Sequence, residues 1–205
     1  MQDLNNIKSA VSRMSKVALN MWALTHRAFM EHDLDLITTA LAEENIINDA
    51  EKDITKDIIE LAKSPSGDKL KNTLNIYANI TQDLELIGDY CKDILERVQI
   101  KIEEKLLFSE EGVREYNELY DKTTQALEEV VFALDKDKPN IIKDSLKQQG
   151  HIDSLVDEYR QHHNERLIRG ACAPFACNMF LNMLDFTAAV YYHTKKIARS
   201  LSKIK

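Results

Sequence analysis

Apolar residues recur along most of this chain at intervals of three and four, the spacing that lines one face of an α-helix. In the first thirty residues the apolar stripe comprises Ile7, Val11, Met14, Ala18, Met21 and Leu24. A longer stripe comprises Leu74, Tyr77, Ile80, Leu84, Ile87, Cys91, Ile94 and Val98. Only five glycines and three prolines occur among the 205 residues, so few positions break the pattern. The pattern predicts an all-α protein built from long amphipathic helices.

Turn-forming residues divide this pattern into six helices. The first predicted helix runs from Leu4 to Met30, and the second follows the break at residues 32–33 and ends at Lys63. The third follows the turn at residues 64–67 and ends at Leu107. The remaining predicted helices cover residues 109 to 135–138, residues 139–170 and residues 174–205.

The six predicted helices fall into two similar halves. The string IINDAEKDI, which begins at Ile46, resembles HIDSLVDEY, which begins at His151. Aligning Ile47 with Ile152 gives an offset of 105 residues (152 − 47), and the ends of the first and fourth helices align at an offset of 103 (132 − 29). An internal duplication explains both observations. We therefore expect two tandem three-helix bundles, one formed by residues 1–107 and the other by residues 108–205.

Charge and composition narrow the class of protein. The net charge is −7 and the isoelectric point is about 5.4, which argues against a general nucleic-acid binder. The sequence has no run of eighteen apolar residues and no signal-peptide pattern at its start. Cys91, Cys172 and Cys177 do not form a pattern typical of a disulfide framework or a zinc site. These features predict a cytoplasmic protein.

Two carboxylates on the third predicted helix, Glu85 and Asp89, are the strongest candidates for chemistry. They are four residues apart, so they share a helix face and repel each other. At 100° per residue both lie off the apolar stripe, which predicts that they are accessible. A bound cation would stabilise such a pair. The alternative is an ordinary solvated acidic face, with Lys92 screening Asp89.

The residues around this pair resemble a family motif. Leu84–Tyr90 reads LELIGDY, which is similar to the third-helix motif L-E-R-I-G-D-H of the PhoU family, with Leu86 in place of Arg and Tyr90 in place of His. The stretches from Gly170 to Pro174 and from His193 to Ala198 are similar to the family's G-x-C-x-P and H-x-x-N-I-A segments. The resemblance covers nearly the whole chain. It implies a fold of two tandem three-helix bundles, in agreement with the duplication.

The resemblance also implies a metal site on the surface of the first bundle. The positions that match the family's ligands are Glu44 and Asn48 on the second helix, and Glu85 and Asp89 on the third. Three of the four carry carboxylates, whose hard oxygens suit iron, manganese or magnesium and, less typically, zinc. Additional candidate ligands or supporting groups are Asp49, Glu51 and Asp83.

The second half departs from the ligand pattern. Ala188 and Tyr192 stand where the first half has Glu85 and Asp89, and the second-helix pair becomes Gln149 and Asp153. One carboxylate of four remains, and the nearby Asp185 and His193 are poor replacements. We therefore expect a cation on the first bundle only. The adjacent His162 and His163 point to different helix faces and are interpreted as surface polar residues.

The resemblance implies a non-enzymatic regulator of phosphate transport. Its partner would be a membrane phosphate transporter, approached at the inner face of the membrane. Alternatively, the chain is the cytosolic domain of a sodium/phosphate cotransporter, whose own transmembrane domain is then the partner. A homodimer is compatible with either arrangement, and no nucleic acid is implied.

Two other classes of function stay open. One is a carboxylate-bridged helical metalloenzyme, although the Glu-x-x-His sequence typical of such enzymes is missing. The other is a purely structural helical dimerisation module. No nucleophile–base pair or glycine-rich phosphate loop is evident, so no catalytic residue is assigned.

Overall fold

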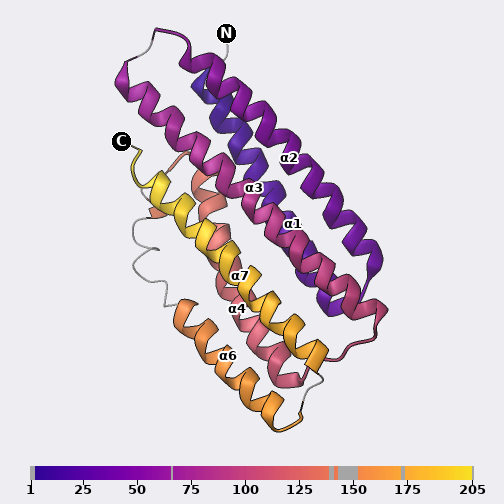
Figure 1. Ribbon diagram of the computed structural model, residues 1–205. Coiled ribbons are helices and arrows are strands. Elements are labelled where there is room, and N and C mark those ends of the chain that lie inside the picture. Colours follow the sequence, from indigo (N-terminus) through magenta and orange to yellow (C-terminus); the bar gives the residue numbers. More distant parts are fainter. Residues whose placement is uncertain (1–2, 66, 139–140, 143–151, 172–173, 205) are drawn as a thin grey trace.

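The computed structural model describes residues 3–65, 67–138, 141–142, 152–171 and 174–204. Its helices are α1 (Leu4–Glu31), α2 (Leu34–Ala62), α3 (Asp68–Glu103), α4 (Glu110–Asp135), α6 (Ile152–Ile168) and α7 (Pro174–Leu201). The described residues outside these helices form turns and short connections, with no strand among them. Helices α1, α2 and α3 form one bundle, and α4, α6 and α7 form the other (Figure 1). The predicted all-α fold of two three-helix bundles is confirmed.

Polar residues fix the starts of three helices. The Asp3 side chain accepts a hydrogen bond from the backbone N–H of Asn5, and Asp33 accepts one from Asp35 at the start of α2. Ser109 accepts one from the N–H of Gly112 at the start of α4 (3.1 Å). Each bond satisfies a donor that the first turn of a helix leaves unpaired.

The ends of three predicted helices differ from the structure. The sixth was expected to reach residue 205 but ends at Leu201. The third was expected to continue to Leu107 but ends at Glu103, where Lys105 adopts a left-handed backbone conformation (φ 53°) that breaks the helix. The fifth was expected to run from Pro139 to Gly170. Its predicted start lies outside the described residues, and the described helix covers Ile152–Ile168. Gly170, with a φ of 69°, follows this helix in the conformation that favours glycine.

One hydrophobic core runs through both bundles. Helix α3 packs against α7, and α1 packs against α4, while α2 and α6 lie on opposite outer sides (Figure 1). At the α1–α4 contact, Trp22 stacks on Tyr120 with ring centroids 5.0 Å apart and donates its indole N–H to Thr124 Oγ1 (2.8 Å). The boundary that we predicted between residues 107 and 108 falls in the α3–α4 linker. The division into two domains there stays a prediction.

Cys91 and Cys177 differ in the state of their sulfur atoms. Cys91 is a free thiol that is completely buried on α3, and burial raises its pKa to about 12, which leaves it unreactive. Cys177, near the start of α7, is buried and disulfide-bonded. Cys172 lies outside the described residues.

Candidate functional site

The candidate site lies where α2 and α3 face each other, and a glycine brings the two helices close. A Cβ atom at Gly88 would lie 3.2 Å from Ile47 Cδ1 and 3.4 Å from its Cγ2. Ile47 is completely buried, so a larger residue at position 88 would force its side chain to shift by a few tenths of an ångström. The glycine in the LELIGDY string therefore allows acidic residues of the two helices to approach one another.

Glu44 is the anchor of this site on α2. It is only 6% exposed, although it carries a carboxylate. Asn48 donates its side-chain N–H to Glu44 Oε1 (2.9 Å), and Lys92 on α3 reaches the same oxygen (3.2 Å). These contacts neutralise a charge that would be costly to bury alone. The Lys92 ammonium is thus a built-in cation beside Glu44.

Glu85 and Asp89 lie on α3 and are both half-buried, so the expectation that they are freely accessible holds only in part. Burial raises the pKa of Glu85, and the charge of Asp89 and a hydrogen bond to it raise it further. The more distant carboxylates of Glu51 and Glu44 act in the same direction. Acidic groups from two helices therefore share one electrostatic environment that favours a proton or a cation.

The four predicted ligands lie in this region, but the structure does not gather them into a formed metal site. Within the described residues, no three His, Cys, Asp or Glu side chains are arranged as a group that could hold a metal ion. The carboxylate and amide oxygens of Glu44, Asn48, Glu85 and Asp89 suit a hard divalent cation. Glu44 is turned toward Lys92, however, so a cation would have to compete with that ammonium.

The additional acidic candidates have different surroundings. Asp49 is exposed and pairs with Lys52 (3.3 Å), and Glu51 accepts a hydrogen bond from Thr55 (3.1 Å). Asp83 does not join the α2–α3 acidic region, and its proposed role there is wrong. It is 2% exposed and faces α7.

Asp83 is instead the polar centre of the contact between the two bundles. His193 Nδ1 lies 2.8 Å from Asp83 Oδ1, and Lys196 donates to the same oxygen at 2.6 Å. The His193 ring also stacks near Tyr90, with centroids 5.7 Å apart. Asp83 lies three residues after Ile80 and four before Ile87, so it falls on the buried stripe of α3. That spacing is the signal by which the sequence analysis could have found it.

Among the residues that the structure describes, the second bundle has no cluster of carboxylates at the positions equivalent to the predicted ligands of the first bundle. Ala188 and the 57% exposed Tyr192 occupy the α7 positions equivalent to Glu85 and Asp89. Asp185 pairs with Arg160, and Asp153 is exposed on α6. Gln149 lies outside the described residues. The restriction of a cation to the first bundle stays a prediction.

A second ionic network joins α4 to α6, and the sequence analysis missed it. Arg166 is 7% exposed and makes two hydrogen bonds to Glu115 (2.9 and 2.6 Å), while His162 contacts the same carboxylate (2.9 Å). The neighbouring His163 is 2% exposed and not a surface residue as expected. Burial lowers the pKa of His163, and the Arg166 charge lowers it further. The spacing Tyr159, His163, Arg166 already placed the histidine on the buried face.

Lys101 is a further buried charge near the end of α3. It is 4% exposed and contacts His32 Nε2, and its ammonium lies 5.0 Å from the ring centre of Phe29 and 5.8 Å from that of Phe108. Burial lowers its pKa. Because His32 ends α1 and Phe108 belongs to the α3–α4 linker, Lys101 fixes the linker against the first bundle.

Comparisons with known proteins agree with this fold and motif. A family model described as the PhoU domain matches residues 11–98. The phosphate-specific transport system accessory protein PhoU homolog of Rhizobium meliloti is 31% identical over 99 residues, which are 47% of this chain and 41% of that relative. The chain thus spans less than half the length of this relative.

Two solved structures extend the likeness over nearly the whole chain. The PhoU crystal structure from Pseudomonas aeruginosa has a TM-score of 0.90 and 16% identity, and the alignment covers 98% of this chain and 96% of that chain. The phosphate transport system regulatory protein PhoU from Streptococcus pneumoniae has a TM-score of 0.85 and 12% identity, covering 98% and 94%. These matches define a PhoU-type double bundle. The resemblance to the PhoU family is confirmed: the PhoU domain model matches residues 11–98, and the chain has the fold of the PhoU crystal structures.

None of the described helices is both long and apolar enough to span a lipid bilayer.

Proposed function

We propose that this protein is a PhoU-type regulator of phosphate transport that acts by binding a membrane transport system and turns over no substrate. The observation that carries the proposal is the PhoU domain at residues 11–98 within a PhoU fold. The Rhizobium meliloti relative is named as an accessory protein of a phosphate-specific transport system. Long helices with an acidic face on α2 and α3 offer extended surfaces for protein contacts. We place its action at the cytoplasmic face of the membrane.

Deletion of the encoding gene tests the proposal. Uptake of radiolabelled phosphate, or its response to phosphate starvation, is expected to change in the deletion strain and to return when the gene is restored on a plasmid. A strain with normal uptake and a normal starvation response would contradict the regulatory role. A hydrolase or oxidase activity of the purified protein that is lost in Glu85→Gln would favour the metalloenzyme instead.

We propose two forms of this role. The protein is either an accessory protein beside a separate transporter or the cytosolic domain of a sodium/phosphate cotransporter. The G-x-C-x-P stretch from Gly170 to Pro174 supports the second form. The two are distinguished by replacing external sodium with choline. Only in a cotransporter does the phosphate uptake that depends on this gene also depend on sodium. Whether the protein dimerises stays a prediction.

We also propose that the α2–α3 acidic region binds a hard divalent cation through Glu44, Asn48, Glu85 and Asp89, with Lys92 as its competitor. The pair Glu85→Gln and Asp89→Asn is expected to abolish binding of manganese or magnesium, measured by calorimetry on protein purified without chelator or nickel resin. Lys92→Met is expected to strengthen binding, because it releases Glu44 Oε1. Iron and zinc are tested by elemental analysis of the same preparation.

Asp53→Asn with Glu60→Gln is the matched control, since it removes two exposed charges from α2 at positions outside the predicted ligands and the additional candidates. Unchanged binding in the Glu85/Asp89 variant would show the assignment to be wrong. Without a cation, that variant should be neutral or more stable by a few tenths of a kcal/mol. The sign follows from the raised pKa of Glu85, whose stabilising contribution exists at acidic pH and is lost as the pH rises through that pKa.

A further inference from the structure

The end of the second bundle exposes a group of large apolar side chains. Leu107 is 81% exposed, Ile168 is 85% exposed, and Phe175 and Leu167 are 56% and 40% exposed. Leu107 belongs to the α3–α4 linker, Leu167 and Ile168 end α6, and Phe175 lies in the first turn of α7. The linker, the end of α6 and the start of α7 lie at the same end of the molecule (Figure 1). We call these four residues the apolar tip. Apolar side chains that gather on a surface in this way are typical of an interaction site.

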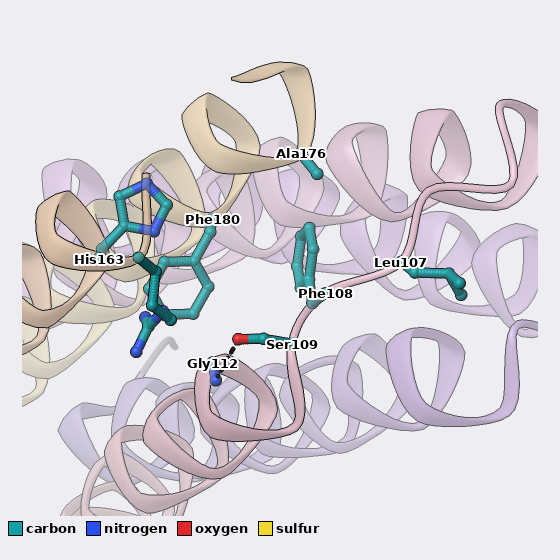
Figure 2. Close-up of a pocket in the computed structure, with 8 residues that line it drawn as sticks. Leu107, Phe108, Ser109, Gly112, His163, Ala176 and Phe180 are labelled. Carbon is teal, nitrogen blue, oxygen red and sulfur yellow. Dashed lines mark hydrogen bonds between the residues drawn. The ribbon is translucent and has the colours of Figure 1, made fainter. Parts of the chain in front are cut away.

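A small pocket lies beside the apolar tip. Leu107 lines it with Ala176 and Arg166, which are the chain neighbours of Phe175 and Leu167. The rings of Phe108 and Phe180 form an apolar wall, with centroids 5.9 Å apart (Figure 2). The space inside admits a group about the size of one water molecule, since its volume is ≈ 10 Å³.

The base of the pocket carries an unused hydrogen-bonding atom. His163 lines the pocket and stacks on Phe180, with ring centroids 5.2 Å apart (Figure 2). Its Nε2 is buried and has no hydrogen-bond partner among the described residues. A buried polar atom without a partner is unfavourable, so a polar group that enters the pocket gains a hydrogen bond there.

The surroundings of the apolar tip are acidic. Exposed Glu103 and Glu104 precede Leu107, and exposed Glu110 and Glu111 follow it, with Lys105 as the one cation within residues 103–111. On α6, Arg169 is paired with Glu165 (2.9 Å). A partner that covers the tip must therefore combine apolar side chains with positive charge.

We propose that the apolar tip docks a basic amphipathic segment on the cytoplasmic face of a membrane transport protein. This inference rests on the proposed function and names the surface that carries it out. Cytoplasmic segments of membrane proteins are rich in Lys and Arg, which complements the glutamates around the tip. The same glutamates disfavour anionic lipid headgroups. They also disfavour a second copy of the chain, which would bring two acidic rims together.

The test uses inside-out membrane vesicles from a strain that overproduces its phosphate transporter. Leu107→Ser with Ile168→Ser is expected to weaken co-sedimentation of the protein by roughly tenfold or more. Ile46→Ser with Ile59→Ser is the matched control, since these α2 residues are 52% and 51% exposed, and it should bind like the wild type. Glu103→Lys with Glu104→Lys should weaken binding and reduce its salt dependence. Far-UV circular dichroism confirms that each variant is folded.

Three outcomes would overturn the proposal. The first is equal binding of the Leu107/Ile168 variant and the wild type. The second is equal binding to phosphatidylglycerol vesicles without protein, which would identify a lipid surface. The third is a dimer that the Leu107/Ile168 substitutions dissociate, which would identify a second copy as the occupant.

Complementation separates this inference from the proposed function. If the gene deletion disturbs phosphate uptake and the Leu107/Ile168 variant restores it fully, the docking surface is wrong and the function stands. If the deletion leaves uptake normal while the variant still loses vesicle binding, the surface stands and the regulatory role is wrong.

Discussion

A variant that combines His193→Leu with Lys196→Met is expected to lose about 3–5 kcal/mol of unfolding free energy. The first substitution removes the His193 contact to Asp83, and the second removes the Lys196 ammonium that donates to the same oxygen. Asp83 then remains as a 2% exposed carboxylate without these partners between α3 and α7. A buried charge without a partner is far costlier than either lost contact, because water cannot replace the partner. Urea titration monitored by circular dichroism and by the fluorescence of Trp22, the single tryptophan, measures the change.

A third substitution in the same background, Asp83→Leu, provides the control. It removes the stranded carboxylate, so the triple variant is expected to recover most of the lost stability although it lacks all three polar groups. A triple variant as unstable as the double variant would contradict this explanation. The loss would then come from the packing of His193 and Lys196, and the buried charge would be irrelevant.

The helices and the core of this protein were predictable because one physical signal repeats along the chain. The apolar stripe of α3, from Leu74 to Val98, is buried at every position that the spacing indicated. The predicted ends were less accurate, since the left-handed conformation at Lys105 carries no clear sequence signal. Local spacing was also sufficient to place Asp83 and His163 on buried faces, although Asp83 was interpreted as a candidate ligand and His163 as a surface residue. It could not identify the partner of Asp83, because His193 lies 110 residues away.

The candidate site was predictable only in part for a similar reason. Glu85 and Asp89 repel each other through local spacing, and the raised pKa of Glu85 reflects that pairing. The burial of Glu44 depends on how closely α2 approaches α3 at Gly88, which is a tertiary property. The bridge from Lys92 to Glu44 depends on the rotamer of a long flexible side chain. Spacing therefore placed Lys92 near Asp89 on the same helix but could not show that its ammonium reaches Glu44 on α2.

Trp22→Ala is expected to destabilise the protein by about 3–5 kcal/mol, because Trp22 is completely buried where α1 meets α4. The substitution leaves a cavity beside the Tyr120 ring and removes the hydrogen bond to Thr124. Thr124→Val keeps the packing of Trp22 but removes this hydrogen bond and the one that Thr124 Oγ1 donates to the Tyr120 carbonyl (2.8 Å), and it should cost about 1–2 kcal/mol. Circular dichroism in urea is the measurement, since the variant has no tryptophan. A Thr124→Val loss equal to that of Trp22→Ala would show that packing contributes little.

The shape of the same unfolding curve tests how strongly the two bundles are joined. Trp22→Ala weakens the α1–α4 contact but leaves α3 packed on α7 and Asp83 bound to His193 and Lys196. The variant is therefore expected to unfold in a single transition at a lower urea concentration than the wild type. Two separate transitions would mean that the α3–α7 contact alone cannot couple the halves. In that case residues 1–107 and 108–205 would behave as independently folding domains.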